Sequence, residues 1–166
     1  MGRGWLRIVN IRPVRTGCMG LLDAFRDSSR RRAGVFVDGP NVLREEFDVD
    51  LDVVRDVAAD EGQVALARLY LDEHAPPELV QAAEARGFEV VTTSGDVDVR
   101  LAVDATAAAT DGTIDVLVVV SRDTDFKPVL ERAAAAGVET VAVAPGSYGR
   151  SDALRNAAQR ALTLEE

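Results

Sequence analysis

From Gly34 onward, short runs of β-branched residues alternate with longer stretches of helical periodicity. This alternation is typical of βαβ units, in which crossover helices join the strands of a parallel sheet. Gly87 and Gly137 directly follow two helical stretches, where a left-handed residue can close a helix. We therefore expect an α/β domain with a mainly parallel, five-stranded sheet. The expected strands are 35–37, 64–71, 88–93, 116–120 and 138–143, and the expected helices are 51–59, 77–86, 98–109, 126–136 and 151–161.

The 166 residues are enough for one domain with a full hydrophobic core. The amino-terminal segment shows neither of the two periodicities, and its first 32 residues hold eight arginines against two acids. We predict that residues 1–33 form a basic, disordered extension in which residues 30–32 are a solvated linker, and that residues 34–166 form the domain. A tail that contacts RNA is the less favoured alternative for the extension.

The chain carries 28 acidic against 19 basic residues, a net charge of −9, and Lys127 is its single lysine. An acid-rich, lysine-poor composition is what we expect of a protein kept soluble in concentrated salt, so we hypothesise a halophilic protein. A urea midpoint that does not respond to KCl would contradict this hypothesis. Because the Debye length falls to about 3 Å at 1 M salt, the acidity does not exclude a nucleic-acid partner.

Several classes of protein are excluded by residues that are scarce. Cys18 is the single cysteine, which rules out an intramolecular disulfide and a cysteine-based metal site. His74 is the single histidine, which argues against Ser-His-Asp hydrolysis and zinc-protease motifs, and we expect it in an exposed loop. No apolar run approaches the length of a membrane span, and no signal-peptide pattern is present. We expect a cytoplasmic protein without a membrane partner.

Carboxylates directly follow two of the expected strands. Asp38 comes after the first strand, and Asp123 and Asp125 come after the fourth. In an open parallel sheet, ligands bind outside the carboxyl ends of the strands, where the strand order reverses. With the order 3-2-1-4-5, strands one and four are neighbours at that point, and these three carboxylates converge. Asp98, which opens the third helix, can lean towards the same crevice.

Such a cluster is suited to divalent cations. Like charges a few Å apart cannot all stay ionised unless a cation neutralises them, and Mg²⁺ and Mn²⁺ prefer hard oxygen ligands. Ions about 3.5 to 4 Å apart can hydrolyse a phosphodiester without a protein nucleophile. Asn41 is placed to position a water or the phosphate, and Arg122 or Lys127 to neutralise phosphate charge.

Each acid also has a purely structural interpretation. Asp38 precedes Gly-Pro and can simply shape a turn, while Asp98 and Asp125 can serve as helix N-caps. Asp96 competes with Asp98 for either role. Asp104 falls on the apolar stripe of its helix, which makes it a further, second-rank candidate. That all three acids have only structural roles, each beside the same predicted crevice, is less expected than a shared functional site.

Three motifs in this order resemble the NYN branch of the PIN-like nuclease superfamily, in particular the LabA/DUF88-like proteins. They are VFVDGPNV at 35–42, DVDVRLAVDA at 96–105 and VVVSRDTDF at 118–126, and the resemblance covers roughly residues 34–162. It implies a three-layer, Rossmann-like domain with an acidic Mg²⁺ or Mn²⁺ site and, in active members, RNA cleavage. By this resemblance the metal ligands are Asp38, Asp98, Asp123 and Asp125, with Asn41 as a polar companion.

The expected function is therefore metal-dependent endoribonuclease activity, on single-stranded rather than paired RNA, with a homodimer as an open possibility. A catalytically silent RNA-binding or regulatory module is the main alternative, because Gly95-Asp96 stands where many relatives have Lys-Gly, and Arg122 where they have Gly. Phosphoryl transfer of the HAD or Toprim type fits less well. HAD enzymes carry their paired acids after the first strand, and Toprim domains have Glu at the position of Asp38.

Overall fold

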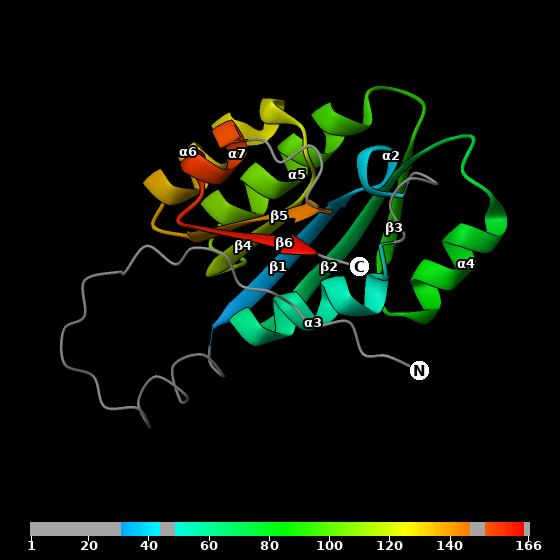
Figure 1. Ribbon diagram of the computed structural model, residues 1–166, viewed down its shortest axis with the longest axis horizontal. Helices are drawn as coiled ribbons and strands as arrows, with labels where there is room; N and C mark the ends of the chain where they lie inside the picture. The colour runs from blue at the N-terminus through cyan, green and yellow to red at the C-terminus, as the bar shows by residue number, and fades with distance from the viewer. Residues whose placement is uncertain (1–30, 44–48, 147–151, 165–166) are drawn as a thin grey trace.

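The computed structural model describes residues 31–43, 49–146 and 152–164. Its core is a six-stranded sheet in the order β3-β2-β1-β4-β5-β6, and every pair of neighbours is parallel (Figure 1). The predicted α/β fold and the predicted order of the first five strands are confirmed. The strands are β1 Arg32–Asp38, β2 Gln63–Asp72, β3 Glu89–Thr93, β4 Val116–Val120, β5 Glu139–Pro145 and β6 Arg160–Leu164.

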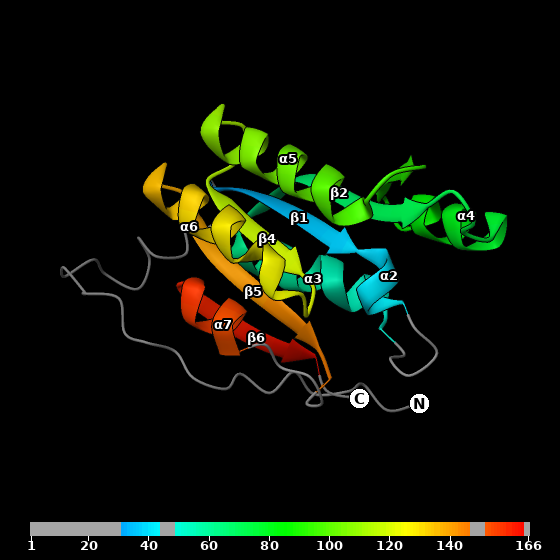
Figure 2. The same ribbon diagram turned by 90° about the horizontal axis from the view of Figure 1, so that it is seen from above.

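Helices cover both faces of the sheet, which gives three layers (Figures 1 and 2). α3 and α4 pack on one face and α5, α6 and α7 on the other, each side with its own apolar cluster. β4 shows why the strands read as continuous apolar runs, because all five of its residues are buried. The helices are α2 Gly39–Val42, α3 Leu51–Glu61, α4 Pro77–Ala85, α5 Val97–Thr110, the 3₁₀ turn η1 Thr124–Phe126, α6 Lys127–Ala135 and α7 Asp152–Ala157.

The strand order reverses between β1 and β4. These two strands lie side by side with Val37 opposite Val120, so the residues that follow them meet at one edge of the sheet. β1 lies between β2 on one side and β4 on the other. The carboxyl edge next to Asp38 is thus the switch point of the fold.

The expected helix over 151–161 is correct in its first part and wrong in its last part. α7 ends at Ala157, and the residues from Arg160 form β6, which pairs with β5 from Val141 to Pro145. The alanines here favour a helix locally, but pairing with the edge of β5 and burial of Leu164 outweigh that preference. The sheet accordingly has one strand more than predicted.

The folded region also begins earlier than predicted. Arg32 is the first residue of β1, and its guanidinium pairs with Asp115 at 3.1 Å. Arg31 pairs with Glu139. The interpretation of these two arginines as a solvated linker is therefore wrong. Residues 1–30, for which disorder was predicted, lie outside the described residues.

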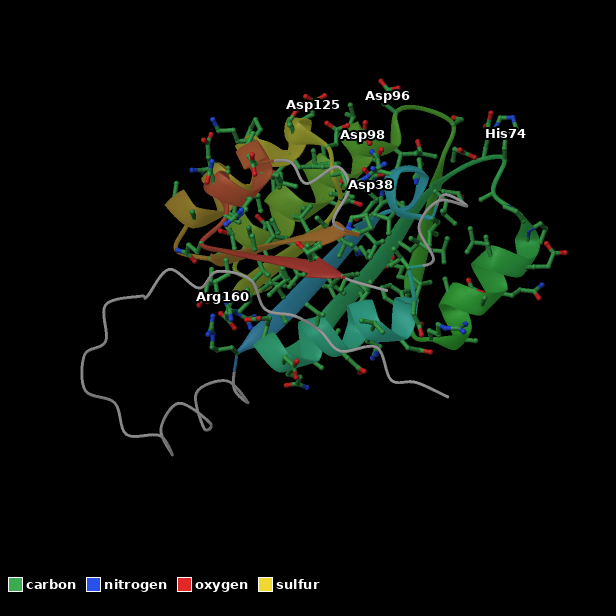
Figure 3. The ribbon with its side chains drawn as sticks, in the orientation of Figure 1. Asp38, His74, Asp96, Asp98, Asp125 and Arg160 are labelled. Carbon is green, nitrogen blue, oxygen red and sulfur yellow. The ribbon has the colours of Figure 1, made fainter. Side chains whose placement is uncertain are left out.

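The amino edge of the sheet carries an ion-pair network, which we call the basal network. Arg160 pairs with Glu61, at the end of α3, and lies 3.5 Å from Glu139, which also binds Arg31. Only 7% of the Glu61 side chain is exposed. Burial and the charge of Arg31 lower the pKa of Arg160. The basal network ties β6, α3 and β5 together at the end of the sheet opposite Asp38 (Figure 3).

Two remaining expectations concern exposure. His74 follows β2 in a loop, and 84% of its side chain is exposed, as predicted. Among the described residues, no helix has both the length and the apolar character needed to cross a membrane.

Candidate active site at the carboxyl edge

Asp38 is the centre of the candidate site. It is the last residue of β1 and is completely buried. Its Oδ2 accepts hydrogen bonds from the hydroxyl of Ser121 at 2.8 Å and from Nδ2 of Asn41 at 2.6 Å. Its Oδ1 is buried too and accepts no hydrogen bond from a described residue. One oxygen is therefore held in place by two donors while the other is left for a ligand.

Burial raises the pKa of Asp38 above its ordinary value, against the opposing effect of the donors on Asn41 and Ser121. The nearby charge of Asp123 adds to the increase. A buried carboxylate oxygen without a partner is costly, and a bound cation removes that cost. The orphaned Oδ1 thus fits a divalent metal ion, and hard oxygen is the donor that Mg²⁺ and Mn²⁺ prefer.

The chain around Asp38 is shaped by close contact between backbones. β1 runs directly into α2, with Asp38 at the N-cap position, but its carboxylate makes no capping hydrogen bond. A Cβ on Gly39 would lie 2.4 Å from the carbonyl oxygen of Tyr70, so only glycine fits there. The following turn of α2 directs Asn41 back onto Asp38. The carboxylate is therefore available for a role other than shaping the turn.

Asp98 lies in the first turn of α5 and is half-buried. Burial raises its pKa, and the charges of Asp38, Asp123, Asp125 and Asp96 raise it further. The predicted acids therefore share one electrostatic neighbourhood, and Figure 3 shows Asp38, Asp98 and Asp125 on the same edge. The N-cap position of α5 belongs to Asp96, whose side chain makes no capping bond.

The two acids after β4 differ in their roles. Asp123 is the N-cap of η1, and its Oδ1 accepts from the backbone N–H of Asp125 at 2.9 Å. The structural interpretation of Asp125 as a helix N-cap is therefore wrong. Asp123 is the N-cap of η1, and Asp125 is exposed within the turn. The N–H of Asp123 donates to Ser121 at 3.0 Å, which links this turn to Asp38.

The acids near Asp38 do not form a complete metal-binding site among the described residues. Within the described ranges, no three carboxyl, imidazole or thiol groups are close enough together to hold a metal ion. Mg²⁺ commonly keeps several water ligands and binds protein through one or two carboxylates. The arrangement fits that mode, with Asp38 as the direct ligand and the other acids acting at longer range.

Asp104 does not join this group. Its carboxylate accepts from the hydroxyl of Tyr70 and from Nε of Arg100, both at 3.0 Å, and lies 3.8 Å from Arg68. These donors satisfy the hydrogen-bonding capacity of the Asp104 carboxylate. We therefore assign Asp104 a structural role, in which it holds α5 against β2. Its place on the apolar stripe is explained by the buried Tyr70 beneath it.

Ser121 is a residue of the candidate site that the sequence analysis missed. It is completely buried and is the first polar residue after the five apolar residues of β4. Its position directly before Arg122-Asp123, at the end of a strand next to β1, was the available signal. The predicted phosphate cation Lys127 is exposed and lies 3.6 Å from Glu131.

Comparison with known proteins agrees with this fold. The profile of the NYN domain matches residues 32–165. The uncharacterized protein MJ0482 of Methanocaldococcus jannaschii is 36% identical over 143 residues, which are 86% of this chain and 59% of MJ0482. This chain thus spans less than two thirds of that relative's length.

A solved structure is similar as well. The crystal structure of VPA0982 from Vibrio parahaemolyticus, a protein of unknown function, has a TM-score of 0.72 at 23% identity. The match covers 84% of this chain and 96% of VPA0982. At this identity the similarity supports the fold alone.

Proposed function

This chain belongs to the NYN-domain family, which is PIN-like, and from that premise we propose that it is a metal-dependent endoribonuclease acting on single-stranded RNA. The observation that carries the proposal is the buried carboxylate of Asp38, held through one oxygen and unpartnered at the other. A buried charge left in this state costs stability in the free protein. Binding a cation at the site compensates for that cost.

In this proposal, Asp38, Asp98, Asp123 and Asp125 would hold Mg²⁺ or Mn²⁺, and Asp38 would bind it directly. The bound ion supplies charge neutralisation at the phosphate and activation of water. Ser121 and Asn41 keep the Asp38 carboxylate in one orientation.

Cleavage of single-stranded RNA by the purified protein in Mn²⁺ and molar KCl tests the proposal. We expect cleavage by the wild type, its loss in EDTA, and its loss in Asp38→Asn. Asp56→Asn is the matched control, since Asp56 is exposed on α3, which covers the opposite face of the sheet. No cleavage by the wild type, or equal cleavage by the two variants, would contradict the proposal.

A catalytically silent RNA-binding module is the second candidate. It is favoured by the absence, within the described residues, of three metal-ligating groups in close contact. It is also favoured by Asp96, which stands where many relatives carry glycine after a lysine. RNA binding that persists in Asp38→Asn, without cleavage by any variant in Mn²⁺, would establish this candidate instead.

A further inference from the structure

α5 carries an exposed apolar row, which we call the valine stripe. It consists of Val99, Val103 and Ala107, which are four residues apart and therefore lie on one side of the helix. Val99 is 60% exposed and Val103 is 59% exposed, on a helix that lies beside α6 on one face of the sheet (Figure 2). Among the described residues, Val53 is the one other exposed large hydrophobic residue. A single exposed valine needs no explanation, but a row of apolar residues on adjacent turns indicates a contact surface.

The amino-terminal segment enters the domain close to the end of α5. The backbone N–H of Arg32 donates to the carboxylate of Asp115 at 2.8 Å, and the N–H of Asp115 donates to the carbonyl of Arg32, also at 2.8 Å. Asp115 follows shortly after α5, which ends at Thr110. The part of the chain before Arg31, residues 1–30, is therefore joined to the domain at the end of the helix that bears the valine stripe.

The apolar residues of this segment match the valine stripe in spacing. Leu21 and Phe25 are four residues apart, as Val99 and Val103 are, and Leu22 adjoins the first of them. The residues between and after them are mostly charged or small. In a helix, Leu21 and Phe25 form one apolar side that can face the two valines.

The segment is long enough to reach the stripe. Phe25 is six residues from Arg31, and an extended chain of that length spans about 20 Å. Val103 is seven residues before Thr110, which is about 10 Å along the helix axis. Phe25 can therefore reach Val103 without any movement of the domain.

The charges of the segment and of the helix end are complementary. The first 32 residues hold eight arginines against two acids, in a chain whose net charge is −9. Arg26 and Arg30 follow Phe25 on the side nearer the domain, and Asp111 is exposed at the carboxyl end of α5. That end also carries the negative pole of the helix dipole, which favours cations.

We propose that the segment around Leu21, Leu22 and Phe25 packs on the valine stripe of its own chain. The segment runs in the direction of α5, with Phe25 against Val103 and Leu21 beside Val99. For these residues, docking on the domain replaces the disorder expected from the sequence. The arginines that follow Phe25 then lie near the acidic end of the helix.

A second copy of the chain fits the valine stripe less well than this segment. Two valines and an alanine supply a small part of the roughly 800 Å² that each partner buries in a stable interface. Asp98 directly precedes Val99, so under the function proposed above the docked segment also holds the first turn of α5 at the candidate site.

Digestion of the full chain with trypsin, which cuts after arginine, tests the docking. Cleavage after Arg26 requires the segment to leave α5, so its rate follows the undocked fraction. We expect Val103→Gln to be cut about 10-fold faster than the wild type, the lower end of the effect of burying one valine. Val53→Gln is the matched control, because Val53 is exposed on α3, which covers the opposite face of the sheet, and it should be cut at the wild-type rate.

Phe25→Gln should accelerate cleavage as Val103→Gln does. The double variant should be cut no faster than either single variant, because each substitution removes the same contact. Urea melts check that every variant keeps the fold, which is expected because Val103 is exposed on the described domain. Equal rates in the wild type and Val103→Gln, or rates that multiply in the double variant, would overturn the docking.

Sedimentation velocity distinguishes the segment from a second copy. We expect the wild type and Val103→Gln to sediment alike, as monomers with respect to this surface. A wild-type dimer that Val103→Gln dissociates would assign the valine stripe to a second copy and overturn the proposal. None of these measurements involves RNA, so a failure of the docking and a failure of the proposed ribonuclease are separate results.

Discussion

Ser121 donates its hydroxyl hydrogen to Oδ2 of Asp38 at 2.8 Å, across the junction of β4 and β1. Both residues are completely buried, so water does not compete for this bond. Asn41 donates to the same oxygen, and the pair of donors leaves Oδ1 as the free face of the carboxylate. The orientation of the proposed metal ligand is therefore set by a neighbouring strand as well as by its own turn.

Ser121→Ala removes this donor and frees the Asp38 carboxylate to rotate. We expect Mn²⁺ affinity and cleavage to fall about 10- to 100-fold, the usual effect of losing a residue that orients a metal ligand. Titration of Mn²⁺ by calorimetry measures the affinity directly. Ser121→Thr keeps the hydroxyl and should recover most of it, since Ser121 borders a cavity. A fully active alanine variant would remove Ser121 from the site.

Asp38→Asn distinguishes a metal-binding role of Asp38 from a role in stabilising the fold. An amide keeps an acceptor for Ser121 and Asn41 but carries no buried charge, so without metal the free energy of unfolding should equal or exceed that of the wild type. Urea melts in EDTA provide the measurement. With Mn²⁺ present, the wild type alone should gain stability, because only its folded state binds the ion. A large loss of stability in EDTA would instead make Asp38 a structural residue.

The stability of the metal-free protein should depend on pH through Asp38. Its pKa is raised in the folded state, so the folded protein binds this proton more tightly than the unfolded chain does. The stabilisation that comes from protonated Asp38 is fully present below pH 3.8, the ordinary pKa of an aspartate. It is lost as the pH rises through the higher pKa of Asp38 in the folded state. Asp98 acts in the same direction. Urea melts in EDTA at a series of pH values should show a decline in the wild type that is smaller in Asp38→Asn. If the stability of the wild type and of Asp38→Asn declined in parallel with pH, the assignment of this pH dependence to Asp38 would be contradicted.

The sequence predicted the central part of this molecule well, and physical reasons explain where it did not. The β4 boundaries were predicted correctly because five apolar residues buried on both faces allow few alternatives. The position of Asp38 at the edge next to β4 was predicted because the ends of neighbouring parallel strands must meet. β6 was missed because its pairing with β5 is a long-range effect that local alanine content opposes.

The side-chain roles were harder to predict than the strands. Whether Asp123 or Asp125 caps the turn after β4 depends on backbone angles within η1, which the residue types alone leave open. Ser121 was passed over because serine after a strand usually only begins a loop. Its bond to Asp38 becomes visible once β1 and β4 are aligned in register. The distances among the acids likewise depend on the tilt of α5, which no motif specifies.

Arg160→Met tests the basal network. It leaves the Glu61 carboxylate, 7% exposed, without its arginine, and removal of one partner of a buried pair costs about 3 kcal/mol or more. The exposed pair of Arg86 and Asp52 provides the control, and Arg86→Met should cost less than about 1 kcal/mol. Urea melts measure both. A double variant, Glu61→Gln with Arg160→Met, should recover much of the lost stability. Equal losses of stability in Arg160→Met and Arg86→Met would refute a structural role for the basal network.

β1 is the first of the described strands along the chain, yet it occupies the middle of the sheet between β2 and β4. During translation, its β4 side therefore has no neighbour until Val116–Val120 has left the ribosome, because strands this distant in sequence pair late. A nascent chain halted in α5 carries Asp38 but not Ser121. Under the proposed function, such an unfinished chain could not degrade RNA, and hydrolytic capacity would arise only after β4 has been synthesised and has paired with β1.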